Sequence, residues 1–231
     1  MLGWAAQQKT NNLDCQKNSD VKMKEITKKY LDQLDLAISR GAEFGLNRKS
    51  FIGSGRVSDG VMKKAIEVLE SDRQKIMHGL PDDISTYCVT LSARAFISLN
   101  LFGIPADMVI GAAYWQGQCV FPCAAEDLKL EMLNPGDESS PIRMHAWVSL
   151  GGDAIIDLTL PHFLAINYDA PKGFFGGIIA NRVKEIKLAG IEYEPIVVGS
   201  EYIGKVNPPD PILELTERRA RRQRLVDFGF I

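Results

Sequence analysis

Three side chains with the chemistry of a nucleophilic triad follow one another along the chain. Cys88, His145 and Asp157 come in that order, each within its own largely apolar segment. A carboxylate can orient an imidazole, the imidazole can take up a proton, and the resulting thiolate can attack a carbonyl carbon. If the fold brings the three together, the sequence predicts an enzyme of acyl transfer.

The stretch from Ser85 to about Leu101 is apolar on nearly every face and predicts a buried helix. Ser85 is the expected N-cap, and Gly103 ends the helix. Cys88 then lies in the first helical turn. Unpaired backbone N–H groups and the positive end of the helix dipole stabilise a thiolate there, and the same groups can bind an oxyanion.

The segments that carry His145 and Asp157 have strand character. Val, Ile and aromatic residues are frequent in five expected strands, at 106–115, 118–121, 143–150, 154–158 and 191–198. Gly151, Gly152 and Asp153 predict a tight turn between the third and fourth of these strands. We therefore expect His145 and Asp157 to be neighbours on one face of a hairpin.

Helices are expected before and after these strands. One begins at Asp20 and ends at Gly41 or Gly45, and another begins at Ser58 or Asp59. The polar residues 5–20 are expected to form a loose arm, 134–141 an exposed loop, and the residues from 210 onward a helix. This order predicts an α+β fold in which N-terminal elements (1–80), a catalytic core (81–200) and a helical tail (201–231) form one domain overall.

The amino-acid composition and net charge argue against several classes of protein function. The 231 residues are 45% hydrophobic with a formal net charge of -2, and the pI is near 6.0. This balance argues against a general nucleic-acid or membrane-surface binder. No apolar run approaches the roughly 20 residues of a membrane helix. The N-terminus does not read as a signal peptide, so a cytoplasmic location with reduced cysteines is expected.

The remaining cysteines and histidines offer weaker candidates. Cys119 and Cys123 are four residues apart, but no second Cys or His pair completes a zinc site, so we expect two buried hydrophobic side chains and no metal. His162 follows a proline in an expected loop. His78 lies near a helix C-terminus, where a cation suits the dipole.

The order of the motifs resembles the transglutaminase-like superfamily of papain-fold cysteine enzymes. The resemblance covers about residues 82–160, a third of the chain. It rests on the motifs Tyr87-Cys88 through Leu101, Phe102-Gly103-Ile104-Pro105-Ala106, Val109-Ile110-Gly111, His145-Ala146-Trp147-Val148 and Ile156-Asp157-Leu158-Thr159. It implies a buried helix carrying Cys88, the nucleophile, packed on an antiparallel sheet. That sheet carries His145, the general base and acid, and Asp157, the orienting group. Where many members have Gly near the cysteine, this chain has Thr86 and Tyr87, so the second oxyanion donor is not assigned.

The expected substrate is a peptide, a protein or a small amide, with hydrolysis preferred over transamidation and no cofactor required. Tyr87, Trp115 and Trp147 are candidate substrate-binding residues. Two alternatives remain open. In the first alternative to an enzyme, the chain is an inactive binding module on the same fold. In the second, it is a regulatory protein that binds through the arginines between 218 and 224. A solvated helix end is the plainer interpretation of those arginines.

Overall fold

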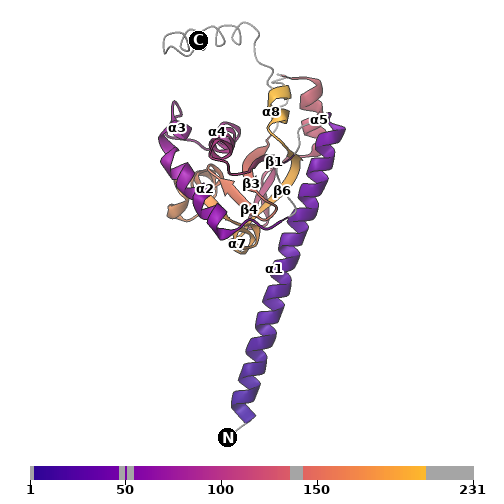
Figure 1. Cartoon of the computed structure of the whole chain (residues 1–231), viewed down its shortest axis with the longest axis vertical. Helices are drawn as coiled ribbons and strands as arrows, with labels where there is room; N and C mark the ends of the chain where they lie inside the picture. Colours follow the sequence, from indigo (N-terminus) through magenta and orange to yellow (C-terminus); the bar gives the residue numbers. More distant parts are fainter. Residues whose placement is uncertain (1–2, 47–49, 51–54, 136–142, 207–231) are drawn as a thin grey trace.

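An antiparallel sheet forms the centre of the computed structural model, which describes residues 3–46, 50, 55–135 and 143–206 (Figure 1). Within these residues the sheet has six strands in the order β2-β1-β3-β4-β5, and β6 pairs with β1 in addition. The strands are β1 (Asp107–Trp115), β2 (Gln118–Phe121), β3 (His145–Leu150), β4 (Ala154–Asp157), β5 (Ile179–Arg182) and β6 (Ile191–Val198). The mixed composition and the antiparallel pairing confirm the α+β prediction.

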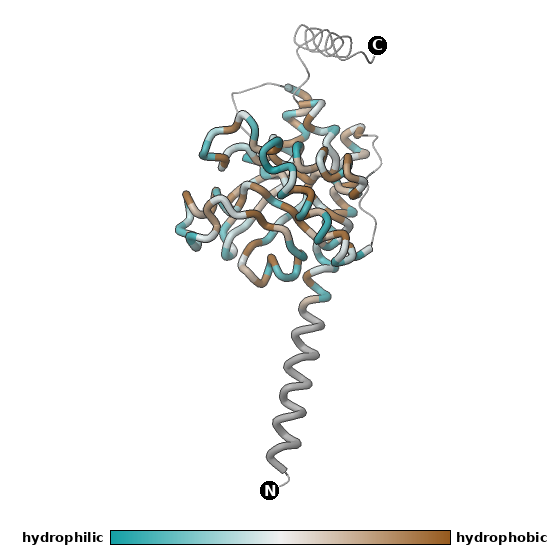
Figure 2. The backbone as a smooth tube through the Cα atoms, turned by 60° about the vertical axis from the view of Figure 1, so that its left-hand side comes forward, coloured by the Kyte–Doolittle hydropathy of each residue, from teal (hydrophilic) through white to brown (hydrophobic). Residues whose placement is uncertain are grey.

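Helices cover both faces of the sheet. They are α1 (Gly3–Glu43), α2 (Asp59–Ser71), α3 (Arg73–Met77), α4 (Cys88–Leu101), α5 (Ala125–Leu133), α6 (Leu160–Asn167), α7 (Val183–Leu188) and α8 (Glu201–Val206), with a 3-10 turn, η1, at Lys172–Phe174. Helix α4 packs on β3 with α2 and α3 beside it, whereas α1 runs along β6 and α7 (Figure 1). Hydrophobic stretches run through the body of the molecule (Figure 2).

The core has two parts because β3 alternates its side chains between the two faces. Ala146 and Val148 join the cluster that contains Leu91 of α4. Trp147 joins the cluster that contains Tyr30 of α1 and Tyr193 of β6. The strand therefore holds a helix against each of its faces.

Helix α1 is longer than the sequence predicted. The expected loose arm at 5–20 was wrong, because the helix runs from Gly3 to Glu43. Residues 4–40 contain no glycine or proline that would end a helix, and a polar composition alone does not prevent a segment from being helical. The helix ends where Gly45 takes a φ of 69° and Leu46 N–H bonds the Gly41 carbonyl.

The start of α2 was predicted correctly, since Ser58 accepts the Val61 N–H at 3.2 Å. The start of α4 was placed two residues too early, since the N-cap is Tyr87 instead of Ser85. Ser85 lies in a turn in which its N–H donates to Asp83 Oδ1 at 2.9 Å, and the helix begins at Cys88. As a result, Cys88 is the first helical residue.

Five short elements in the second half of the chain were not predicted, namely α5, α6, β5, α7 and α8. The expected helix from residue 210 and the arginines at 218–224 lie outside the described residues, as does most of the loop at 134–141. Among the helices of the described part, none is both long and apolar enough to cross a membrane.

Candidate active site

His145 and Asp157 form a buried pair at one end of the β3–β4 hairpin. His145 Nε2 lies 2.6 Å from Asp157 Oδ2, and neither side chain is exposed. The hairpin pairs Val148 with Ile156. If this register is continued by one residue, Asp157 lies opposite Trp147. Trp147 is two residues after His145 on the same strand, so Asp157 and His145 lie on the same face of the sheet. The predicted neighbourhood of the two side chains is present in the structure.

Asp157 accepts hydrogen bonds on both carboxylate oxygens. Oδ1 accepts from the N–H of Thr159, the hydroxyl of Thr159 and the N–H of Leu160, at 2.9, 3.2 and 3.0 Å. Oδ2 accepts from the Tyr193 hydroxyl at 2.7 Å in addition to the imidazole. These donors fix the orientation of the carboxylate and favour its ionised form.

Cys88 lies beside the start of the strand that carries His145. Its Sγ lies 3.8 Å from the carbonyl oxygen of Met144, the residue directly before His145. Because Cys88 is the first residue of α4, its own N–H and the next two have no partner within the helix and can serve an oxyanion. Cys88 is buried, with 6% of its surface exposed.

The charge on Asp157 determines the protonation of His145. Burial lowers the pKa of His145, but the charge and hydrogen bond of Asp157, with a contribution from the Cys88 side chain, raise that pKa to about 10. Burial raises the pKa of Asp157, yet the imidazolium and the two backbone N–H groups hold it below 3.8. The imidazole therefore carries a proton on Nε2 in either protonation state, which fixes the neutral tautomer.

The second imidazole nitrogen has no hydrogen-bond partner in the described part of the chain. His145 Nδ1 is buried and makes no hydrogen bond among the described residues. A buried nitrogen without a partner is costly, and such atoms are frequent where a reacting group is bound. With Nε2 held by Asp157, Nδ1 is the atom available to Cys88.

Aromatic rings enclose the imidazole. Phe121 of β2 stacks on it with ring centroids 4.7 Å apart and an angle of 25°, and Phe163 of α6 packs on Phe121 at 4.4 Å. Trp147 and Tyr193 flank it at 6.1 and 6.2 Å. The sequence analysis did not identify Phe121 or Tyr193, although the alternation of apolar residues in β6 placed Tyr193 on a buried face.

The candidate substrate-binding residues lie at different depths. Tyr87, the N-cap of α4, is half-buried beside Cys88 and remains a candidate. Trp115 is 8% exposed and packs edge-on against Phe174 at 5.6 Å. Trp147 is completely buried and donates to the Tyr30 hydroxyl at 3.0 Å, so it belongs to the core and no substrate contact is assigned to it.

Two predictions about the remaining candidates need correction. His162 is not in a solvated loop. It is a buried residue of α6 whose Nδ1 accepts from the Gly176 N–H at 3.2 Å. Cys119 is exposed and Cys123 half-buried, so they are not a buried pair, because β2 presents this end of the sheet to solvent. His78 is the C-cap of α3, as its sequence position indicated. In the part of the chain that the structure describes, no cluster of His, Cys, Asp and Glu could hold a metal ion.

Comparison with known proteins adds no family assignment. No protein-family model matches the chain, and no curated protein or solved structure gives a significant match. The chemistry of this protein must therefore be inferred from its own residues.

Proposed function

We propose that this protein is a cysteine-dependent acyl-transfer enzyme of transglutaminase-like, papain-fold type, acting on an amide or peptide bond. The observation that carries the proposal is the arrangement of one imidazole. Its Nε2 is held 2.6 Å from a buried carboxylate, and its Nδ1 is left without a hydrogen bond near the thiol of Cys88. This division of roles between the two nitrogens is what proton transfer from a thiol requires.

In the proposed reaction His145 already holds the proton of Cys88 on Nδ1, as its raised pKa favours, and the Sγ thiolate bonds to the substrate carbonyl carbon. The backbone N–H groups at the start of α4 stabilise the oxyanion. The C–N bond then breaks, the leaving amine takes the proton from Nδ1, and a thioester remains on Cys88. Water gives a proton to Nδ1 while its oxygen attacks the thioester, the C–S bond then breaks, and the carboxylic acid leaves with the Cys88 sulfur and the proton on Nδ1 restored to their starting state.

Hydrolysis is the proposed outcome because water is the most abundant acceptor. The proposed function needs no cofactor, and the expected substrate is a peptide, a protein or a small amide. Tyr87 is the side chain best placed to contact it, since it is half-buried and adjacent to the nucleophile.

The test compares the alkylation rate of individual cysteines by mass spectrometry. The exposed Cys119 is the internal reference. We expect iodoacetamide to modify Cys88 faster than Cys119 at pH 7 despite its burial, and His145→Gln to slow this reaction by about tenfold or more. His78→Gln removes an exposed histidine and is the matched control. With p-nitrophenyl acetate, we expect a burst of one equivalent of p-nitrophenol that is absent in Cys88→Ser.

Two results together would reject the enzyme. They are modification of Cys88 no faster than Cys119 and a p-nitrophenyl acetate reaction that is unchanged in Cys88→Ser. They would favour a binding module on the same fold, because the three side chains would then be present without reactivity.

A further inference from the structure

A cavity of about 420 Å³ lies between α1, the segment before α2 and the β5–α7 connection. None of the triad residues lines it. Cationic side chains predominate among its charged groups, which are Lys24, Lys28, Arg56, Arg182, Lys184 and a single acid, Asp153. A surface that gathers five cations around one concavity attracts anions.

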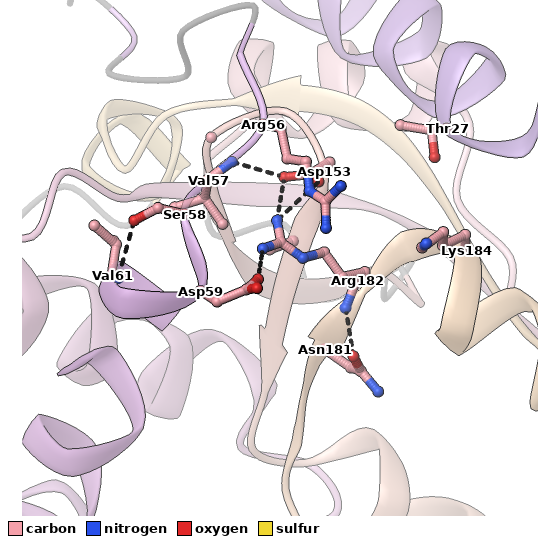
Figure 3. A network of polar contacts seen from close by, with 12 residues as sticks. Thr27, Arg56, Val57, Ser58, Asp59, Val61, Asp153, Asn181, Arg182 and Lys184 are labelled. Atoms are coloured by element: carbon pink, nitrogen blue, oxygen red, sulfur yellow. Dashed lines mark hydrogen bonds and ion pairs between the residues drawn. The ribbon is translucent and has the colours of Figure 1, made fainter. Parts of the chain in front are cut away.

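Arg182 lines the cavity and is held there by a network of polar contacts (Figure 3). Its side chain is 8% exposed, and its Nη1 donates to both oxygens of Asp153 at 3.0 and 2.8 Å. Its second amino group pairs with Asp59, the first residue of α2. Asp153 also accepts the Val57 N–H at 3.0 Å. The network thus joins three segments distant in sequence and leaves Arg182 neutralised.

The other four cations are paired less completely than Arg182. Arg56 has only a distant contact with Asp153, at 3.7 Å, and that carboxylate already serves Arg182. Lys28 pairs with Asp32, but both side chains are more than half exposed, so the pair contributes little. Lys24 has no ion pair among the described residues. Lys184 lies across the cavity on α7, 3.3 Å from Glu185 (Figure 3).

The cavity also has an apolar part. Met23 and Leu31 of α1 line it, one helical turn before and one turn after Thr27. The hydrocarbon stems of the lysines extend this surface. An occupant that uses the whole cavity would combine an anionic group with an apolar body.

We propose that this cavity binds a small organic phosphate, with the phosphate between Lys24, Arg56 and Lys184 and an apolar group against Met23 and Leu31. A phosphate carries up to two charges and three acceptor oxygens, which suits several Lys and Arg side chains better than a single carboxylate does. The site shares no residue with the triad, so this proposal stands or falls independently of the proposed acyl transfer.

Isothermal titration calorimetry with phenyl phosphate, inorganic phosphate, benzoate and benzyl alcohol tests the proposal. We expect one phenyl phosphate per chain, weaker binding of inorganic phosphate and benzoate, and none of benzyl alcohol. Lys24→Gln and Lys184→Gln should each weaken phenyl phosphate by about threefold and together by about tenfold. Lys129→Gln, an equal loss of charge on the exposed side of α5, is the matched control and should change nothing.

Leu31→Ser separates the two parts of the site. It should weaken phenyl phosphate and leave inorganic phosphate unaffected. Equal affinity of the double lysine variant and the wild type, with both folded by circular dichroism, would overturn the proposal. Benzoate that binds as tightly as phenyl phosphate would overturn the assignment of a phosphate. The same titrations on Cys88→Ser should be unchanged, which keeps this result separate from any reaction at the triad.

Discussion

Replacing Asp157 by Asn should change how the stability of the fold depends on pH. The carboxylate raises the pKa of the buried His145 from 6.5 to about 10. Each tenfold change in proton affinity is worth about 1.4 kcal/mol, so the protonated pair contributes roughly 4–5 kcal/mol. This is a large part of the 5–15 kcal/mol that usually separates folded from unfolded chains.

The sign follows from the direction of each pKa change. Since the folded pKa of His145 lies above the unfolded value of 6.5, its contribution is complete below pH 6.5 and disappears as the pH rises towards 10. Since the folded pKa of Asp157 lies below 3.8, its contribution is complete above that value and is lost as the pH falls through the lowered pKa. The pair is therefore most stabilising between about pH 4 and 6.5.

The assay is urea unfolding followed by tryptophan fluorescence at several pH values from 6.5 to 10. At pH 6.5 we expect Asp157→Asn to be less stable than the wild type by roughly 4–5 kcal/mol. Towards pH 10 the difference should shrink to the value of the hydrogen bonds that Asn cannot accept, about 1–2 kcal/mol. Lysines and tyrosines elsewhere titrate in both proteins and cancel in the difference.

His78→Gln should follow the wild type at every pH, because His78 is an exposed C-cap. If the variant is too unstable to measure, an NMR titration of the His145 ring in the wild type gives the same information. A constant difference in stability between wild type and Asp157→Asn across the pH range, or a His145 ring that titrates near 6.5, would refute the reasoning.

Three further substitutions test the supports of the fold and the site. Tyr193→Phe removes one hydrogen bond to the triad carboxylate and should cost about 1–2 kcal/mol in urea unfolding while raising the pKa at which the triad imidazole titrates by NMR, because the carboxylate charge then acts on the imidazole alone. An unchanged titration would contradict its positioning role. Arg182→Met leaves Asp153 buried without its partner and should cost about 3 kcal/mol, so an unaltered urea midpoint would count against the network. Gly111→Ala would bring a Cβ to 2.0 Å from the Glu194 carbonyl, so the strands must separate, and we expect a lower melting temperature by calorimetry. A melting temperature equal to that of the wild type would show that β1 and β6 can adjust without cost.

The elements that carry the triad were predictable because each has a strong local signal. The apolar run before Leu101 indicated a buried helix, and the Gly-Gly-Asp turn indicated the hairpin that places His145 near Asp157. The hairpin joins residues close in sequence, so its register depends on few choices.

The residues and elements that surround the triad and hold it in place could not be predicted in the same way. Tyr193 reaches Asp157 from a strand 36 residues further along the chain, and it does so only because β6 returns to pair with β1. The segment from Leu160 has a proline near its start and no polar face, so its helical period was obscured. Contacts between residues distant in sequence determine where these elements form and what they pack against, and the local sequence carries little information about such contacts.

Strand β3 separates the thiol from the imidazole's aromatic surroundings, since Cys88 belongs to the cluster on the α4 side and Trp147 and Tyr193 to the cluster on the α1 side. Cys88 and His145 come together only when both halves of the core have packed on the same strand. If Cys88 reacts as proposed, its fast alkylation should return late in refolding, after the slowest fluorescence phase, and a partly collapsed chain should be protected from premature modification.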